Sequence, residues 1–315
     1  KLRRGCRRRR ANQRRCGISE GGLGSVRGSA ALCPFFGVDR ICDWSLPQGL
    51  GVFSENAQRF PAMLSGRPID AVLFDMAGVL VDVSGSFRRV VQEVVRSYTG
   101  VTPAKAEIQA YKDRGGFDDD WKLSHTMLRE AGHALPFEEV VAAFQRIYLG
   151  ARHETGVFDG LIAEEPALLP TGVLAGLAAR YPLALVTGRP ERDAQWTLAR
   201  FGWDGFFPSV VGMDQQAGRG KPDPYGIELA MEQLDALHGR PFNRTRAVYV
   251  GDNGDDMRAA SAAGLLAIGV VPPYLDYHAH RATLMEAGAD VVISRVADVP
   301  MLLPRKEAGS ALVAG

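Results

Sequence analysis

Three carboxylates that follow the apolar run 247–250 could together hold a hard metal ion. Asp252, Asp255 and Asp256 lie within a stretch of five residues. Like charges packed this closely repel one another, so we expect a cation to compensate them. Magnesium suits this role because it takes oxygen ligands and keeps coordination positions for water and phosphate oxygens. An acidic helix start, which the helix dipole favours, accounts for one of the three acids but not for all of them.

A fourth carboxylate, Asp75, follows the apolar run 71–74, and Gly78 comes three residues later, where the chain has to turn. Folds of the α/β class place reactive groups at the carboxyl end of a buried parallel strand. Taken alone, the motif is weak evidence, because Asp75 could simply cap the following turn. Asp75 is therefore a candidate reactive group whose meaning depends on the motifs that accompany it.

Two further motifs could bind a phosphate group. Thr187 and Gly188 end the run 183–187 just before a helical pattern, so a hydroxyl and a helix N-terminus could face the same anion. Lys221 stands in Gly-Lys-Pro-Asp-Pro, between turn residues, where it could neutralise a phosphate or a carboxylate. The simpler alternatives are a plain helix cap for Thr187 and a solvated turn lysine for Lys221.

In their order and spacing, the four motifs together resemble motifs I to IV of the haloacid dehalogenase superfamily. The first motif of that superfamily reads Asp-x-Asp-Gly-(Thr/Val)-(Leu/Val). This chain departs from it at one position, where Ala77 replaces the second aspartate. Asp75 and Thr187 are 112 positions apart, which leaves room for the helical cap of one large subfamily. The resemblance covers about 69–303. Residues 82–89 and 119–123 resemble a poorly characterised group of phosphatase-like proteins within the superfamily.

The resemblance implies a metal site and a covalent intermediate. Asp75 would be the nucleophile and would form an aspartyl-phosphate. Magnesium would be held by Asp75, Asp252 and the backbone carbonyl of Ala77. Asp256 would support this site directly or through water.

The resemblance also implies how a small phosphorylated metabolite would be held. Thr187, the N–H of Gly188 and Lys221 would bind the transferring phosphoryl group. Phosphoryl transfer depends mostly on such positioning and on charge stabilisation, and Lys221 contributes to both.

Ala77 removes one part of this machinery. In the phosphatases of the superfamily the second aspartate protonates the leaving alkoxide and then deprotonates the attacking water, and alanine can do neither. Losing a general acid–base typically lowers the rate by about 10²–10⁴-fold, which is about 3–5 kcal/mol of barrier. The metal needs only the backbone of residue 77, so Ala77 bears on proton transfer and not on metal binding.

Three hypotheses follow, of which we favour the first. The chain is a magnesium phosphatase, slow or acting on substrates with good leaving groups. Alternatively it resembles the phosphonoacetaldehyde hydrolases, which carry alanine at this position and use a cap lysine to form an imine with the substrate aldehyde. Lys112 and Lys122 are the candidates, although each also fits an exposed helix charge. The third hypothesis is a non-catalytic member that binds phosphate ligands or a partner.

The elements that must position these residues alternate between short apolar runs and helical patterns. The predicted strands are 71–74, 183–187, 209–212, 247–250, 265–271 and 291–294. The predicted helices between them are 171–180, 190–201, 224–238, 255–264 and 279–287. This alternation predicts an α/β fold, a Rossmann-like, doubly wound parallel sheet.

The stretch 87–168 breaks the alternation and predicts a smaller, all-helical cap domain. Its predicted helices are 87–98, 103–113, 121–131 and 136–149. The core domain would then comprise 69–86 and 169–303, followed by a frayed tail at 304–315. The candidates for lining the cleft beneath the cap are Arg88, Arg89, Arg114, Asp118 and Trp121, each of which fits a surface or cap-packing residue equally well. The pair Gly115-Gly116 could let a cap loop approach the substrate closely, or could form a hinge or turn. We expect His278 and His280 at a helix surface.

The first 62 residues differ from the rest of the chain. They hold 12 of the 37 basic residues, only 4 of the 36 acidic residues and all four cysteines. Disulfides therefore cannot hold the main body together. No run of 18 apolar residues exists, so no membrane span is expected. We expect residues 1–68 to be a largely disordered basic leader.

Three interpretations of this leader stay open. An Arg-rich, acid-poor start is typical of an organelle transit peptide, which would place the protein in a plastid or mitochondrion. Otherwise we expect a cytoplasmic protein. The leader could also be upstream sequence, with Met63 as the true start. Nucleic-acid binding by the run of arginines is the least favoured, because no aromatic residue interleaves with them.

Overall fold

The computed structural model describes residues 67–117 and 119–304. All of them belong to one compact unit, Ser54–Gly315. The predictions for the basic leader, its four cysteines, Met63 and the tail beyond residue 304 fall outside the described residues, as does Asp118. None of the described helices is long and apolar enough to cross a membrane.

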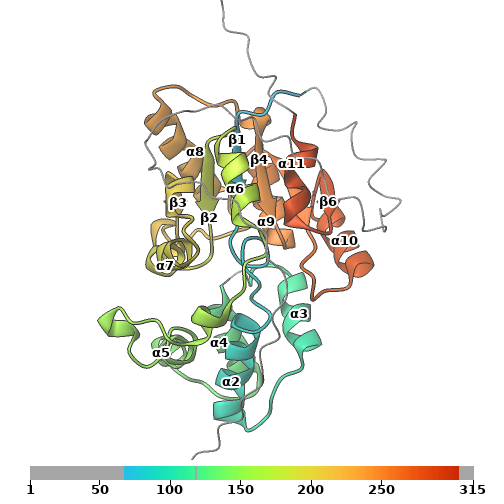
Figure 1. The fold of residues 1–315 in the computed structure, drawn as a ribbon. Coiled ribbons are helices and arrows are strands. Elements are labelled where there is room, and N and C mark those ends of the chain that lie inside the picture. The colour runs from blue at the N-terminus through green and yellow to red at the C-terminus, as the bar shows by residue number, and fades with distance from the viewer. Residues whose placement is uncertain (1–66, 118, 305–315) are drawn as a thin grey trace, which may run out of the picture. The chain divides into compact units, whose positions relative to one another are not determined.

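Six parallel strands form one sheet in the described part of the chain, in the order β3-β2-β1-β4-β5-β6 (Figure 1). Their bounds are β1 (Ala71–Phe74), β2 (Leu183–Val186), β3 (Ser209–Val211), β4 (Ala247–Gly251), β5 (Leu266–Val270) and β6 (Val291–Ile293). The chain moves from β1 toward one edge and from β4 toward the other edge. Neighbouring β1 and β4 therefore flank the point where the winding reverses, which is where such sheets bind ligands.

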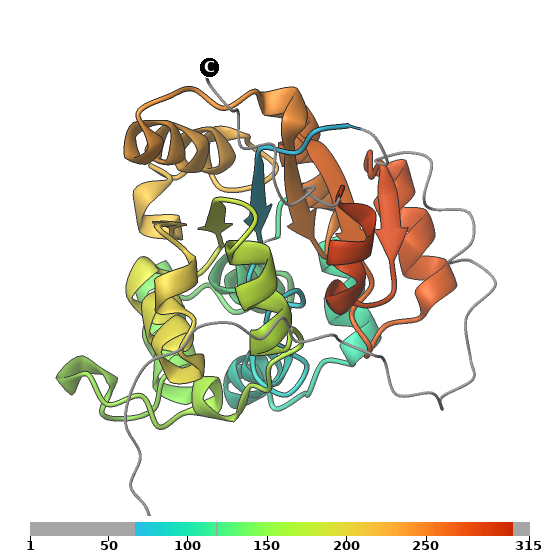
Figure 2. The same ribbon diagram turned by 45° about the horizontal axis from the view of Figure 1, so that its top comes forward.

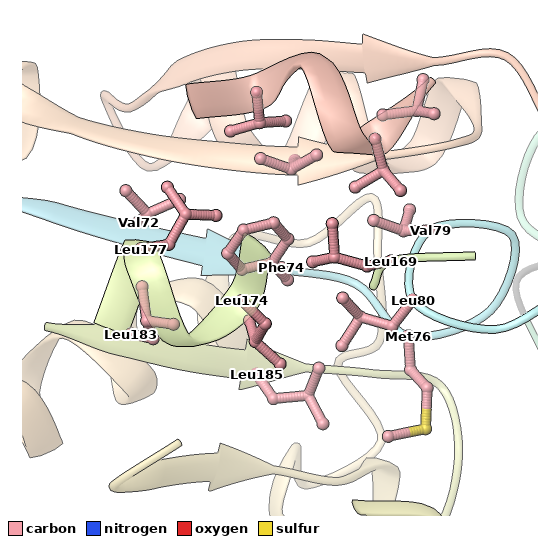
Figure 3. Close-up of a cluster of buried hydrophobic side chains, with 14 of the residues drawn as sticks. Val72, Phe74, Met76, Val79, Leu80, Leu169, Leu174, Leu177, Leu183 and Leu185 are labelled. Atoms are coloured by element: carbon pink, nitrogen blue, oxygen red, sulfur yellow. The ribbon is translucent and has the colours of Figure 1, made fainter. Parts of the chain in front are cut away.

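The strands are short and apolar because helices cover both faces of the sheet. The helices that flank the sheet are α6 (Thr171–Ala178), α7 (Glu191–Phe201), α8 (Tyr225–His238), α9 (Gly254–Ala262), α10 (Tyr277–Glu286) and α11 (Val299–Leu302). One core cluster joins the sheet to α6, α7 and α11, and a second joins the other face to α8, α9 and α10. Figure 3 shows Phe74 of β1 next to Leu174 and Leu177 of α6. The predicted doubly wound parallel sheet is confirmed.

The stretch between β1 and α6 is helical, as its sequence predicts. Its helices are α2 (Phe87–Thr99), α3 (Lys105–Asp113), α4 (Asp120–Glu130) and α5 (Phe137–Tyr148). They pack around a third hydrophobic cluster, to which α2 contributes four valines at helical spacing. Figures 1 and 2 show this helical insertion beyond the carboxyl ends of the strands. The division into domains at residues 87 and 168 stays a prediction.

Short 3-10 helices complete the described chain, and none of them is predicted above. They are His153–Thr155, Leu161–Glu164, Asp204–Phe206, Met213–Gln215, Arg244–Arg246 and Val296–Asp298. Each is only one turn long and so carries no apolar periodicity for the sequence to show.

Candidate active site

The polar residues of the four motifs meet because their strands are neighbours in the sheet. Asp75 leaves β1 and its N–H donates to the carbonyl of Val250, 2.9 Å away in β4. Asp252 leaves β4, and Thr187 leaves β2 on the other side of β1. Parallel strands end at a common edge, so residues that are more than a hundred positions apart in sequence line one site.

Three carboxylates form the centre of the site. Asp75, Asp252 and Asp256 each offer an oxygen, and these oxygens lie within 4.8 Å of one another. Asp256 sits in the first turn of α9, where its Oδ2 accepts from the N–H groups of Asp252 (2.9 Å) and Asn253 (3.0 Å). The turn between β4 and α9 thus fixes the third carboxylate against the other two.

The electrostatics of this cluster fit a divalent cation. Burial, followed by the carboxylates of Asp256 and Asp75, raises the pKa of Asp252 well above its usual range. A hard cation would favour the ionised form of all three groups, and closely spaced oxygen donors are what Mg²⁺ takes. The described donor set therefore fits the predicted metal.

Lys221 lies beneath the cluster and neutralises part of its charge. Its Nζ is 3.0 Å from Oδ1 of Asp75 and 2.7 Å from Oδ1 of Asp256, and the side chain is almost fully buried. It also donates to the hydroxyl of Tyr249, a buried residue of β4 (3.4 Å). The alternative of a solvated turn lysine is wrong.

Gly78 lets the chain after β1 pass close to the carboxylate cluster. Its φ is +74°, and a Cβ at this position would lie 2.0 Å from Oδ2 of Asp252. Its N–H donates to the carbonyl of Val81 (2.8 Å) and so closes the turn. Both the backbone conformation and the available space require glycine here.

Thr187 and Gly188 border the same site from the end of β2. The Thr187 hydroxyl is buried and accepts from the N–H of Arg189 (3.3 Å), while its carbonyl accepts from Gln216 (2.9 Å). The helix α7 begins shortly afterwards, at Glu191. Thr187 therefore lies in the loop just before a helix N-terminus, where a phosphate-binding residue is predicted. It does not cap the helix, because the N-cap is Pro190.

A cavity of about 960 Å³, including its solvent-open part, joins these strand ends to the helical insertion. Asp75, Ala77 and Asp252 lie on its sheet side. Its residues from the helical insertion are Phe87, Arg88, Gln109, Lys112, Asp113, Asp119, Asp120, Trp121, Gln145 and Tyr148. A concave site with polar groups converging from both sides is typical of a small-molecule site.

The structure separates the predicted cleft residues into two groups. Arg88, Lys112 and Trp121 line the cavity, whereas Arg89 and Arg114 are exposed and lie outside its lining. Lys122 is likewise exposed, on α4, and does not line the cavity. Of the two candidate lysines, only Lys112 is placed where a substrate could reach it.

The pair Gly115-Gly116 brings a loop of the insertion against the core. The N–H of Gly116 donates to Oδ2 of Asp255 (2.7 Å), and the other Asp255 oxygen pairs with Arg258 (3.0 Å). Asp255 therefore holds this loop and does not belong to the carboxylate cluster. The three neighbouring carboxylates of the sequence therefore fall into two groups. Asp252 and Asp256 belong to the cluster that could hold a metal, whereas Asp255 makes this contact with the loop.

Arg189 and Glu165 form a buried ion pair that the sequence did not indicate. Arg189 Nη1 is 3.0 Å from Oε2 of Glu165, with both side chains almost fully buried. The guanidinium also lies over the ring of Phe87, 4.9 Å from its centroid. Arg189 stands inside the second motif, but only the fold shows that Glu165 is its partner.

His280 also contacts the site, so the expectation that it lies at a helix surface is wrong. Its Nε2 is 2.6 Å from the carbonyl of Asp252, and the ring is buried. His278 is exposed, as expected. The phase of α10, which begins at Tyr277, turns the first histidine outward and the second toward Asp252 at the end of β4. Spacing in sequence alone could not supply that phase.

Comparisons with known proteins agree with this geometry. A family model for haloacid dehalogenase-like hydrolases matches residues 69–264. The phosphorylated carbohydrates phosphatase of Thermotoga maritima is 30% identical over 231 residues, covering 71% of this chain and 94% of that protein. An imidazoleglycerol-phosphate dehydratase of Phytophthora nicotianae is 32% identical over 218 residues, covering 65% of this chain. This alignment covers only 44% of the Phytophthora protein.

A solved structure shares the fold. The crystal structure of a predicted phosphoglycolate phosphatase from Haemophilus somnus aligns with a TM-score of 0.57 at 20% identity. The alignment covers 74% of this chain and 97% of that one. The two structures therefore share their fold over nearly the whole of the Haemophilus chain.

Proposed function

The chain belongs to the haloacid dehalogenase-like hydrolases, and we propose that it is a magnesium-dependent phosphatase of small phosphorylated metabolites. The observation that carries this proposal is the buried cluster of Asp75, Asp252 and Asp256 with Lys221 beneath it. Relatives named phosphorylated carbohydrates phosphatase and phosphoglycolate phosphatase support a substrate of this class.

The proposed metal site uses the residues that the fold brings together. Asp75, Asp252 and the backbone carbonyl of Ala77 would hold Mg²⁺, with Asp256 supporting them. The ion would neutralise phosphate charge. Lys221 would hold the Asp75 carboxylate in position through its hydrogen bond of 3.0 Å.

The proposed reaction runs through Asp75. Its carboxylate attacks phosphorus, the bond between phosphorus and the leaving oxygen breaks, and water then displaces Asp75 to release phosphate. Thr187 and the N–H of Gly188 would hold the oxygens of the transferring group. Ala77 supplies no proton in either step.

A phosphate-release assay with a panel of phosphate monoesters tests the proposal. We expect release that requires Mg²⁺ and falls by about 10²-fold or more in Asp75→Asn, because the nucleophile is lost. The matched control is Asp70→Asn, which alters a carboxylate at the opposite end of β1, where it pairs with Arg246. Equal activity in Asp75→Asn and wild type would refute the mechanism. Retained Mg²⁺ or phosphate binding without any turnover would favour the non-catalytic alternative.

A second candidate function, phosphonate hydrolysis, is favoured by one observation, the placement of Lys112 in the cavity. In that reaction Lys112 would form an imine with a substrate aldehyde. Borohydride reduction in the presence of phosphonoacetaldehyde would then attach the substrate to Lys112. Unmodified Lys112 after this treatment would exclude the second candidate.

A further inference from the structure

Lys112 reaches the cavity from the last turn of α3 and is held there by its neighbours. Its Nζ lies 3.0 Å from Oδ1 of Asp120, at the start of α4, and 3.4 Å from the carbonyl of Phe117. The side chain is 22% exposed, and it lines the cavity that also contains Asp75. Two elements of the insertion thus present one ammonium group to the site.

The charge of Lys112 acts on the metal-binding cluster itself. Burial and the two neighbouring carboxylates raise the pKa of Asp252, and Lys112 opposes this rise more strongly than Lys221 does. Lys221 is itself within hydrogen-bond distance of Asp75. Lys112, Asp75 and Ala77 line the same cavity, so the ammonium group borders the space that a substrate bound at Asp75 would fill.

Ala77 lines the cavity at the position where the resemblance implies an aspartate that protonates the leaving oxygen. Its methyl group cannot donate a proton. Asp193 also lines the cavity, and burial raises the pKa of its carboxyl group, so it is the alternative proton donor. Three other polar side chains are less suited. Arg88 and Arg189 do not release protons. Burial raises the pKa of Tyr274 well beyond its usual range, so it is an even weaker acid than usual.

We propose that Lys112 protonates and stabilises the leaving oxygen, and so takes over the task that Ala77 cannot perform. The proposal rests on the phosphatase function proposed above. As Asp75 bonds to phosphorus, the bond to the leaving oxygen breaks, and the oxygen takes a proton from the ammonium group to give a neutral alcohol. The resulting amine takes a proton from the water that attacks the aspartyl-phosphate, which restores the ammonium group. Lysine is among the side chains that serve as general acids and bases.

The test compares leaving groups. p-Nitrophenyl phosphate releases a phenolate that leaves without a proton, whereas glycerol 2-phosphate releases an alkoxide that needs one. In Lys112→Met we expect kcat/KM for glycerol 2-phosphate to fall by about 10²–10⁴-fold. The fall for p-nitrophenyl phosphate should be about 10-fold or less, from the lost charge alone. Lys122→Met removes the exposed lysine of α4 and should behave as wild type.

A second variant distinguishes proton donation from a structural role. Adding Ala77→Asp to Lys112→Met restores an acid at the usual position and should recover much of the activity toward glycerol 2-phosphate. Equal losses for both substrates, or no rescue, would overturn the role of Lys112 but leave the Asp75 mechanism intact. The same selective loss in Asp193→Asn, with Lys112→Met unaffected, would assign the proton to Asp193 and overturn the proposal. If wild type hydrolyses neither substrate, the phosphatase function fails together with it.

Discussion

At the scale of single residues, a Cβ at Gly78 would have two effects. It would strain the backbone, and it would collide with the Asp252 carboxylate of the proposed metal site. We expect Gly78→Ala to lower the free energy of unfolding by about 1–2 kcal/mol, because alanine is strained at positive φ. We also expect Mg²⁺-dependent turnover to fall by about 10²-fold, because the new Cβ would displace the Asp252 carboxylate. Urea unfolding and the phosphate-release assay measure the two effects.

Gly100 provides the matched control. It has the same φ of +74°, at the end of α2, and a Cβ there would meet nothing within 4 Å. Gly100→Ala should lose similar stability and keep its turnover. If both variants lose turnover equally, the effect comes from strain and not from the approach to Asp252.

The residues of the site that the sequence predicted are those carried by local motifs. Asp75, Lys221 and Asp252 each stand beside a strand end or a turn that the sequence marks, and so their positions follow from local rules. Glu165 and His280 stand in no such motif. Glu165 meets its partner only through the return of the chain from the helical insertion, and His280 only through the phase of α10.

At the scale of elements, the cap of α9 positions Asp256, a carboxylate of the proposed metal site. Asn253 Oδ1 accepts from the N–H groups of Asp255 (2.8 Å) and Asp256 (3.1 Å). We expect Asn253→Ala to cost about 1 kcal/mol of stability. It should also raise the Mg²⁺ concentration for half-maximal turnover by about 10-fold, because the orientation of Asp256 is loosened. A magnesium titration of the phosphatase rate measures this shift.

Asp276 caps α10 in the same manner, through the N–H of Ala279 (2.8 Å), but it does not line the cavity. Asp276→Ala should therefore lose similar stability without a shift in Mg²⁺ dependence. A comparable shift in both variants would contradict the role assigned to the α9 cap.

The regular elements were predictable because their patterns are strong. Strands such as β1 and β2 are wholly apolar runs flanked by turn residues, and helices α2 and α5 of the insertion have clear apolar faces. Their observed ends differ from the predicted ones by no more than two residues. The single-turn helix Leu161–Glu164 was missed because four residues cannot show a period.

At the scale of the whole described unit, the ion pair of Arg189 and Glu165 ties the loop after β2 to the segment that leaves the helical insertion. We expect Glu165→Ala to destabilise the protein by about 3–5 kcal/mol, because it leaves a buried guanidinium without its counter-charge. Urea unfolding gives this change directly. The control is Glu93→Ala, which removes an exposed pair with Arg96 and should cost less than about 1 kcal/mol. Similar losses in both variants would show that burial adds nothing to the pair.

In the proposed reaction, the sheet and the insertion together hold a substrate phosphate against Asp75, and Asp75 becomes covalently phosphorylated during turnover. Rapid quenching of the enzyme during turnover with Mg²⁺ and p-nitrophenyl phosphate, followed by peptide mass spectrometry, tests it directly. The account predicts one added phosphoryl group on the peptide that contains Asp75, absent from the Asp75→Asn protein and when Mg²⁺ is removed. Phosphate release at the wild-type rate by Asp75→Asn, or a phosphoryl group on another residue, would contradict it.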